Sequence, residues 1–577
     1  MEIVMYSGKS IAVELPKALN GGRLITLSNG YVYYVTEFKW DKVKRRTVDN
    51  RVSIGKIDPN NKKMMFPGKR YYEFFGDKRS DVDSFYFPLG RTEAGSFDFV
   101  LSYGPYVVLK KCFELCGGSD ALNKSMPRLS AEITALAIHA IVAENSRAQD
   151  FPYWAFDNYC GLKNPISDST VSRIYREIAE TPACINLFFE YYQELFHKTF
   201  PCSKNRVVAF DSTNQVTESH NQTHAYRGKS KTGEKLPIIC TAMFVDEKTG
   251  ISLWYEHFDG NVLDKSETPY SIEKATQLGF KKLFAMFDRG YYSLENVSRL
   301  KELGIEYGMM MPETVNLVTD TLEKWRSELR LKEVYYIPEE DIYGVQTTVK
   351  LPNGEMLPAY VYYDDHTATD ERNSIHGKVK FFMNEAEERT RYSEKMREYF
   401  SKRAIIVTKL EQGQKDDLGR NFTLKIDTEQ VQKANDEAGY FMILSNTVMT
   451  AKDMICIARN RDCVEKGFKD LKSHFDLART YTHSDATYSG KMFVAFIALI
   501  IIQTFRYYEQ SLLHLKTAET VATLIAELRK YKIQEKKDHT WMPVYAMNKK
   551  QKSIIDAVSL NEDLLEKNVR QLKIERL

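Results

Sequence analysis

Apolar residues occur in short unbroken runs in the middle of the chain, and two of these runs end in aspartate. The run VVAFD ends at Asp211, and the run LFAMFD ends at Asp288. Runs of this length without polar alternation are typical of central strands that are covered on both faces. If the two strands are adjacent and parallel, both aspartates lie at the carboxyl ends of strands, where open α/β sheets place ligands.

Other strand and helix patterns surround these two runs. We predict further strands over 236–246, 252–260, 306–312 and 439–446, and helices over 266–279 and 293–304. Early strands joined by short turns, followed by alternating helices and strands, favour a mixed sheet with helices on its faces. This order resembles the ribonuclease-H-like fold.

Helical spacing follows the last of these strands, in the segment ARNRDCVEKGFKDLKS. Apolar residues at offsets of 4, 7 and 11 from Val464 form one face of the predicted helix. Arg461, Glu465 and Lys472 form a stripe that borders this face. A helix with this pattern packs on the edge of a sheet, with Glu465 turned toward the strand-end aspartates.

Three carboxylates brought together in this way suit a two-metal phosphoryl-transfer site. Asp211 and Asp288 repel each other until a cation neutralises them, and hard oxygen ligands favour Mg²⁺ or Mn²⁺. Arg461 and Lys472 would hold DNA phosphates beside the metals. Taken singly, each residue has a structural explanation as a turn, cap or surface charge. The shared order and context favour the catalytic interpretation.

Patterning outside this core divides the chain into further regions. The predicted regions are a β-rich N-terminal module over 1–95, a helical region over 96–204, the catalytic core over 205–312 and 438–510, an inserted β-containing subdomain over 313–437, and a helical, basic C-terminal region over 511–577. For the first two regions, two interpretations stay open, namely DNA binding and a purely structural role. The helix after Ser167, for example, fits either a recognition helix or a packing helix.

Composition is that of a folded globular protein, with 43% hydrophobic and 28% charged residues. The net charge is only +3, so local basic patches would have to hold any DNA. Eight cysteines without a CxxC pair predict reduced thiols in a cytosolic protein. The apolar run from Met492 to Phe505 is too short to cross a bilayer, so it predicts a buried core helix and no membrane contact.

The segments AFDSTNQ, MFDRGYYS and ARNRDCVEKGFKDLKS resemble those of bacterial insertion-sequence transposases with a DDE triad and a tyrosine-arginine-glutamate-lysine signature. The resemblance spans about residues 205–510. It implies that Asp211, Asp288 and Glu465 are the catalytic metal ligands and that Arg461 and Lys472 contact DNA. It also implies two Mg²⁺ or Mn²⁺ ions, double-stranded DNA as transposon end and target, and a homodimer in the synaptic complex. Such a protein would act in the bacterial cytoplasm, at the nucleoid.

Other positions extend or qualify the resemblance. The family branch carries an insertion between its second aspartate and its glutamate, which fits the 177 residues (465 − 288) between those positions here. The signature tyrosine is replaced by Ala458, so another group would have to hold that phosphate. Lys229 and Lys231 lie in a family-like loop and are predicted DNA contacts. His220 and His224 have no third ligand at a plausible spacing, so we do not predict a zinc site.

The leading hypothesis is a transposase that binds inverted-repeat ends, cleaves them by metal-dependent phosphodiester hydrolysis and joins the 3′-hydroxyl ends to target DNA. One alternative is a metal-dependent, structure-selective nuclease. Another is a domesticated DNA-binding protein without catalysis.

Overall fold

The structure is a computed structural model, which describes the chain apart from residues 1–4, 7–9, 12, 18–22, 42–45, 60, 76–99, 165, 203–204, 229, 232, 280–282, 511–519, 537–538, 573 and 575–577. Contacts divide it into two compact units, one within residues 1–99 and the other over 100–574. Each unit has its own hydrophobic core, and each is described by itself.

The N-terminal unit is built on an antiparallel sheet in the order β3-β7-β6-β5-β4, which confirms the predicted β-rich module. Gly30 has a φ of 82° in the turn before β5, a backbone conformation that favours glycine. Helix α1 covers one face of the sheet, where Phe74 and Phe75 pack on Tyr34 at ring-centroid distances of 5.1 and 5.0 Å. The elements are β1 (Met5–Tyr6), β2 (Ser10–Ile11), β3 (Val13–Glu14), β4 (Arg23–Thr26), β5 (Tyr31–Asp41), β6 (Arg46–Ile57), β7 (Met64–Pro67) and α1 (Lys69–Phe75).

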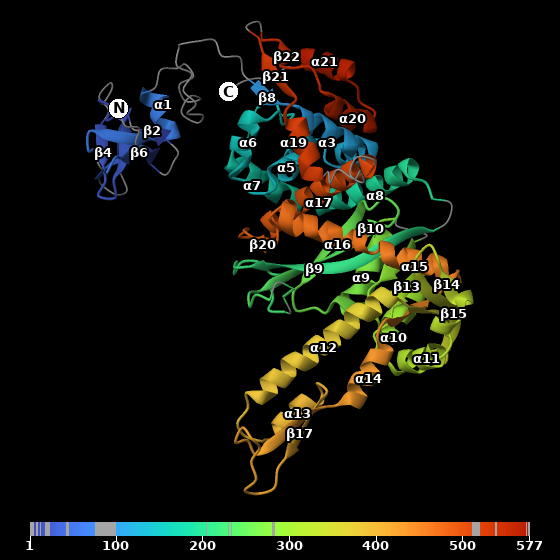
Figure 1. The fold of residues 1–577 in the computed structure, drawn as a ribbon. Coiled ribbons are helices and arrows are strands. Elements are labelled where there is room, and N and C mark those ends of the chain that lie inside the picture. The colour runs from blue at the N-terminus through green and yellow to red at the C-terminus, as the bar shows by residue number, and fades with distance from the viewer. Residues whose placement is uncertain are drawn as a thin grey trace. The chain divides into compact units, whose positions relative to one another are not determined.

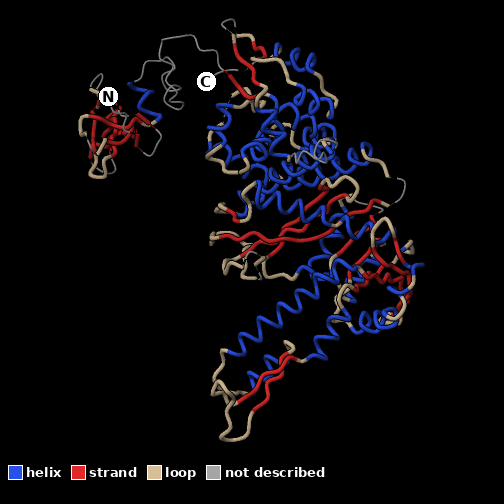
Figure 2. Tube along the Cα trace, viewed as in Figure 1, coloured by secondary structure: helices blue, strands red, loops and turns tan. Residues whose placement is uncertain are grey.

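The larger unit is organised around one mixed sheet (Figure 1, Figure 2). Strands β9 (Arg206–Thr217), β10 (Ile238–Asp246) and β11 (Ser252–Asp259) are successive antiparallel neighbours. On the other side of β9 lie β12 (Leu283–Phe287) and β13 (Glu306–Met310), both parallel to it. The spatial order 3-2-1-4-5, with the last two strands parallel to the first, is the ribonuclease-H-like arrangement. The fold class predicted from the sequence is therefore confirmed.

Side-chain alternation along these strands places helices on both faces of the sheet. On one face, Tyr255 packs against Phe189 of α8 and Phe496 of α17, at 5.8 and 4.8 Å between ring centroids. On the other face, Phe210 packs against Tyr291 at 5.5 Å. The helices nearest these strands are α8 (Pro182–Thr199), α9 (Asp264–Gln277), η1 (Arg289–Tyr291), α10 (Leu294–Glu302), α16 (Asp462–Lys469) and α17 (Asp485–Tyr508).

The segment between β13 and β19 first extends the same sheet. β16 (Met356–Tyr363) pairs with β19 (Tyr440–Ser445), and β15 (Ile342–Lys350) and β14 (Tyr336–Ile337) follow outward. The hairpin predicted in the inserted subdomain is present, but it belongs to the core sheet and not to a separate one, because β16 pairs directly with β19. The segment also contains α11 (Asn316–Arg326), η2 (Leu329–Leu331) and η3 (Glu333–Tyr335).

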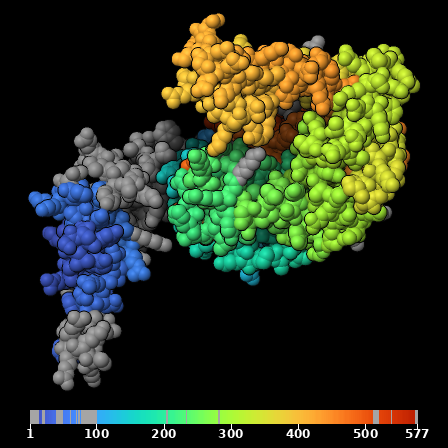
Figure 3. Space-filling model, turned by 90° about the horizontal axis from the view of Figure 1, so that it is seen from below, coloured from blue at the N-terminus to red at the C-terminus, as the bar shows by residue number. Residues whose placement is uncertain are grey.

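Beyond β16 the insertion projects from the sheet (Figure 1). It has a small core of its own, which includes Ala386, Phe400, Ile405 and Phe422. From below, a hollow separates this projecting part, coloured yellow to orange, from the green core (Figure 3). Its elements are α12 (Asp365–Glu387), α13 (Glu394–Ser401), β17 (Ile405–Lys409), β18 (Phe422–Ile426) and α14 (Thr428–Glu437).

The helical region before the core packs around α17. Among the described residues, α17 is the one helix with the length and apolarity of a membrane span, and 94% of its most apolar window is buried inside the protein. The core helix predicted over 492–505 is therefore confirmed. α7 buries Val171, Ile174 and Ile178 and packs against α17, which matches the packing interpretation for that face of the helix. The region contains α3 (Gly104–Leu115), α4 (Gly118–Ser125), α5 (Ser130–Ala143), α6 (Phe151–Asp157) and α7 (Asp168–Ala179).

The C-terminal region contains strands as well as the predicted helices. β21 (Lys532–Glu535) pairs with β22 (Trp541–Pro543) and with β8 (Val100–Ser102), so both ends of the larger unit meet in one small sheet. The remaining elements of the unit are α15 (Ala451–Asn460), η4 (Asp470–His474), β20 (Arg479–Thr480), α19 (Val521–Arg529), α20 (Lys549–Ala557) and α21 (Glu562–Arg570).

A close crossing of two helices yields a stability prediction. A Cβ atom at Gly490 of α17 would lie 1.8 Å from the carbonyl oxygen of Tyr175 in α7, a backbone atom that cannot rotate away. We expect overpacking in Gly490→Ala to cost about 3 kcal/mol and helix propensity to return about 1 kcal/mol, a net loss of about 2 kcal/mol in denaturant unfolding. Gly377→Ala in α12 is the control, because nothing lies within 4 Å of its Cβ position. It should gain about 0.5–1 kcal/mol, and equal effects would contradict the prediction.

Candidate active site

The first two carboxylates come from adjacent parallel strands, as the apolar runs predict. β12 pairs with β9 up to Met286 opposite Ala209, so Asp288 and Asp211 follow at matching positions. Asp288 comes directly after β12 and caps the short helix η1. Asp211 does not end its strand, because β9 continues for six more residues to Thr217 (217 − 211). It instead lies where the neighbouring strand β12 has ended.

Each aspartate uses its two oxygens differently. Oδ1 of Asp211 accepts the backbone N–H of Ser212 at 2.7 Å, and Oδ1 of Asp288 accepts that of Arg289 at 2.8 Å. The Oδ2 atoms both face Nη1 of Arg461, at 3.7 Å from Asp211 and 3.8 Å from Asp288. The Oδ2 atoms are therefore the pair that faces the Arg461 guanidinium.

Arg461 also reaches the third carboxylate. Its Nη2 donates to Oε1 of Glu465 at 3.0 Å, four residues along the chain. Arg461 is only 15% exposed, whereas Glu465 is 58% exposed. One guanidinium thus lies within 4 Å of all three carboxylates that the sequence singles out, and the structure brings the residues of the predicted triad together.

Burial makes the negative charge at this position unfavourable. It raises the pKa of Asp211 above its ordinary value, although Lys231, the Ser212 N–H, Tyr291 and Arg461 each favour the ionised carboxylate. A site that resists ionisation despite these neighbours would gain from a stronger positive charge than one guanidinium, and a divalent cation supplies one.

The predicted single helix carrying Arg461, Glu465 and Lys472 is wrong in one respect. Arg461 lies at the junction between α15 and α16, and residues 470–474 form a π-helical turn, η4. Lys472 lies inside this π turn, so its place relative to Arg461 and Glu465 does not follow from α-helical spacing. Its side chain is half-buried. Burial, and then the nearby Lys231 ammonium, lower its pKa.

The two loop lysines have different outcomes. Lys229 lies outside the described residues, so its predicted DNA contact is untested. Lys231 donates its ammonium to the carbonyl oxygen of Ser212, and its backbone N–H donates to Asn214 at 3.1 Å. Its charge therefore lies beside Asp211 and Lys472. A DNA contact from Lys231 stays a prediction.

Tyr291 is a residue of the site that sequence reasoning missed. Its hydroxyl donates to Oδ1 of Asp211 at 3.0 Å, and the side chain is 3% exposed. The only available signal was the position of Tyr291 three residues after Asp288, in one turn of η1. That turn folds the tyrosine back over Phe210 and toward the other aspartate.

The three carboxylates suit a hard divalent cation, because their oxygens are hard ligands. Two of these oxygens, Oδ2 of Asp211 and Oδ2 of Asp288, face the same point. Within the described residues, no three His, Cys, Asp or Glu side chains lie close enough together to hold a metal ion at once. The carboxylates are spaced around the Arg461 guanidinium. Ligation by all three therefore requires that Arg461 leave them.

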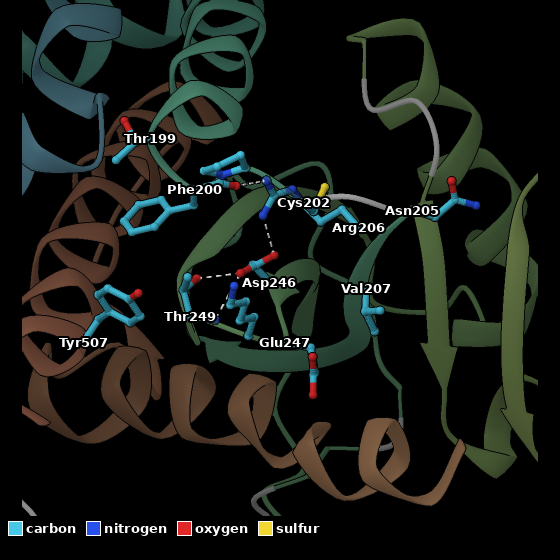
Figure 4. Close-up of a pocket in the computed structure, with 12 residues that line it drawn as sticks. Thr199, Phe200, Cys202, Asn205, Arg206, Val207, Asp246, Glu247, Thr249 and Tyr507 are labelled. Atoms are coloured by element: carbon cyan, nitrogen blue, oxygen red, sulfur yellow. Dashed lines mark hydrogen bonds and ion pairs between the residues drawn. The ribbon is translucent and has the colours of Figure 1, made fainter. Parts of the chain in front are cut away.

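Three other features are not part of this site. A cavity of about 310 Å³ at the start of β9 is lined by Arg206, Asp246 and Thr249 among others (Figure 4), and Asp211 is not among its lining residues. There Arg206 and Thr249 donate to Asp246 at 2.7 Å each, which describes a structural ion pair and turn. His224 pairs with Asp259 at 2.6 Å and has no third metal-ligating partner in the described part of the chain. Ala458 packs against an apolar cluster on the buried side of α15.

Residues 203–501 match the sequence model of a protein family described as the transposase DDE domain, which is a little over half of the chain (299 of 577). Among solved structures, the chain is similar to the piggyBac transposase in a cryo-EM synaptic complex with hairpin DNA. That similarity has 10% identity, covers 82% of this chain and 87% of that chain, and has a TM-score of 0.32. A crystal structure of the Mos1 mariner paired end complex with Mn shares 12% identity over 43% of this chain and 72% of that chain, with a TM-score of 0.13. No curated protein sequence matches the chain.

Both TM-scores are below 0.5, so the fold assignment rests on the strand order and the family assignment on the matched residues. The strand order and the carboxylates beside β9 define the class as a ribonuclease-H-like α/β protein. Within that class, the chain belongs to the transposase DDE domain family. The protein is a transposase, and its general role is in DNA transposition.

Proposed function

We propose that this transposase binds the inverted-repeat ends of an insertion sequence, cleaves them by metal-dependent hydrolysis and joins the 3′-hydroxyl ends to target DNA. The observation that carries the proposal is the gathering of Asp211, Asp288 and Glu465 around Arg461, beside the central strand of a ribonuclease-H-like sheet. In this proposal the three carboxylates are the catalytic residues and hold two Mg²⁺ or Mn²⁺ ions. When bound, such ions activate the attacking hydroxyl group and stabilise charge on the leaving 3′-oxygen.

The chain's own residues have separate tasks in this reaction. The Oδ2 atoms of Asp211 and Asp288, which face Arg461, would hold the shared cation, and their Oδ1 atoms are held by backbone N–H groups. Arg461 faces the same Oδ2 oxygens that would hold a divalent cation, so the guanidinium would have to turn away for these oxygens to act as metal ligands. A guanidinium released at this position is well suited to a bidentate contact with a DNA phosphate.

Basic residues next to Asp211 would hold the DNA strand in the site. Lys472 is half-buried beside Lys231, so the two like charges repel until an anion lies between them or beside them. A phosphate group relieves that repulsion. We further propose that two copies of the chain act together on a pair of ends, in the bacterial cytoplasm.

The test uses a labelled duplex made from the DNA that flanks the gene. Full-length protein in Mg²⁺ is expected to cut the duplex at a discrete end and to join that end to a second duplex, and EDTA should abolish both steps. Cutting without joining would support a structure-selective nuclease instead. Binding that is indifferent to EDTA, without any cutting, would overturn the enzymatic proposal in favour of a DNA-binding protein.

A further inference from the structure

We propose that Tyr291 is a positioning residue, which holds the carboxylate of Asp211 so that its Oδ2 atom is presented to a divalent cation. The inference rests on the proposed function, because it concerns the metal of that site. Its basis is the hydrogen bond from the Tyr291 hydroxyl to Oδ1 of Asp211 at 3.0 Å.

The ring of Tyr291 has little freedom to aim its hydroxyl elsewhere. It packs against Phe210 at 5.5 Å and Phe287 at 6.0 Å between ring centroids, and both phenylalanines directly precede the aspartates of the site. The backbone is also held, since Nδ2 of Asn296 donates to the carbonyl oxygen of Tyr291 at 2.8 Å. Tyr291 is therefore fixed by the same two strands whose carboxylates it serves.

The hydroxyl creates a difference between the two aspartates. Oδ1 of Asp211 receives two donors, the Ser212 N–H at 2.7 Å and Tyr291, whereas Asp288 accepts the Arg289 N–H at 2.8 Å. Two donors on one oxygen fix the rotation of the carboxylate about its Cβ–Cγ bond. The other oxygen, Oδ2, is then directed toward the point that Arg461 Nη1 shares with Asp288.

Removing the hydroxyl should weaken metal binding without unfolding the protein. Groups that orient a metal ligand typically change metal affinity about 10–100-fold when they are lost. In Tyr291→Phe the ring contacts remain, and Oδ1 keeps the Ser212 N–H, so no buried acceptor is left without a partner. The expected change is therefore in affinity and not in folding.

The experiment measures Mn²⁺ binding to the full-length protein by calorimetry in the absence of DNA. Tyr291→Phe is expected to raise the dissociation constant by about 10-fold or more. Tyr292→Phe is the matched control, because Tyr292 is the next residue, is half-buried, and makes no hydrogen bond to Asp211 in the described structure. Its dissociation constant should equal that of the wild type, and both variants should melt at similar temperatures.

The possible results separate the two proposals. If binding is present and is lost in Asp211→Asn, but Tyr291→Phe binds Mn²⁺ as tightly as wild type, the positioning role is overturned and the proposed function stands. Equal weakening in both tyrosine variants, or a fall in melting temperature specific to Tyr291→Phe, would also overturn it in favour of a packing role. If the wild type shows no Mn²⁺ binding that depends on Asp211, the metal site of the proposed function fails and the inference fails with it.

Discussion

Replacing Asp211 with asparagine is expected to lower DNA cleavage by at least about 10³-fold while leaving the protein folded. Removal of one member of a catalytic group that acts as a unit typically costs on the order of 10³–10⁶ in rate. The asparagine has the same shape but no charge, so it cannot share a divalent cation with Asp288. Cleavage of a labelled transposon-end duplex in Mg²⁺ measures the loss.

The stability of this variant should move in the opposite direction from its activity. The folded-state pKa of Asp211 is raised, chiefly by burial. The free energy of unfolding of the protein therefore falls as pH rises from the unfolded pKa of this carboxyl group to its folded pKa. Above both values the ionised group is a net cost to folding, and Asp211→Asn removes that cost. The melting temperature at pH 7 should be equal to or above that of wild type. A strained, unfavourable group retained at a site is typical of a functional role.

Asp259→Asn is the control for both measurements. Asp259 ends β11, which is separated from β9 by β10, and pairs with His224 at 2.6 Å, outside the three carboxylates. Its variant should cleave within a few fold of wild type. If both variants lost cleavage activity to a similar extent, Asp211 would have no specific role in the reaction, because loss of one negative charge anywhere near the sheet would explain the result.

Local patterns predicted the strands of the core because an unbroken apolar run by itself indicates a strand that is covered on both faces. The unbroken apolar runs before Asp211 and Asp288 require cover on both faces, and the helices packed on the two faces of the sheet provide it. The register of β9 and β12 then places both aspartates at one position along the sheet. Helical spacing likewise fixes which face of α16 is buried, and Glu465 lies beside that face, where it pairs with Arg461.

The continuation of β9 beyond Asp211 could not be predicted from local pattern. The polar residues Ser212, Thr213 and Asn214 look like a turn, yet they are buried strand residues paired with β10. At least one polar side chain of this strand has a distant partner. The hydroxyl of Tyr488, for example, donates to Gln215 at 2.6 Å from a helix more than 270 residues away in the chain. A polar run is tolerated inside a sheet only when such partners exist.

The π-helical turn at 470–474 was missed for a similar reason. Asp470 is the residue that fixes it, and the side chain is 2% exposed. Its partners are His474, whose Nδ1 lies 2.7 Å from Oδ1, and Arg506, which contacts both oxygens and donates from Nη2 to Oδ1 at 2.7 Å. Arg506 belongs to α17, so no pattern within the helix that carries Glu465 shows that the turn must widen.

This network leads to the second large expected effect. Asp470→Asn should lower the free energy of unfolding by about 3 kcal/mol, because it leaves the Arg506 guanidinium facing an amide and breaks a buried pair. The estimate lies at the lower end of the range for buried pairs, since Arg506 and His474 are partly exposed to water. Urea unfolding of the full-length protein at pH 7 measures the change.

Asp462→Asn is the matched control, because Asp462 forms an exposed pair with Lys466 at 2.8 Å in the preceding helix, α16. It should change stability by less than about 0.5 kcal/mol.

The pH dependence of the same variant tests the electrostatic origin of the effect. Burial alone would raise the pKa of Asp470, but Arg506 and His474 outweigh it and hold the pKa below its ordinary value. The stability that this carboxylate contributes is therefore present above its unfolded pKa of about 3.9 and is lost as pH falls through the folded pKa. The hydrogen bond to Asp470 raises the pKa of His474, so its contribution is complete below about pH 6.5 and is lost as pH rises through the folded pKa. The difference between wild type and Asp470→Asn should accordingly be largest between these limits and should shrink in acid. A difference that stays constant from pH 3 to pH 8 would assign the stabilisation to packing of the turn and not to its charges.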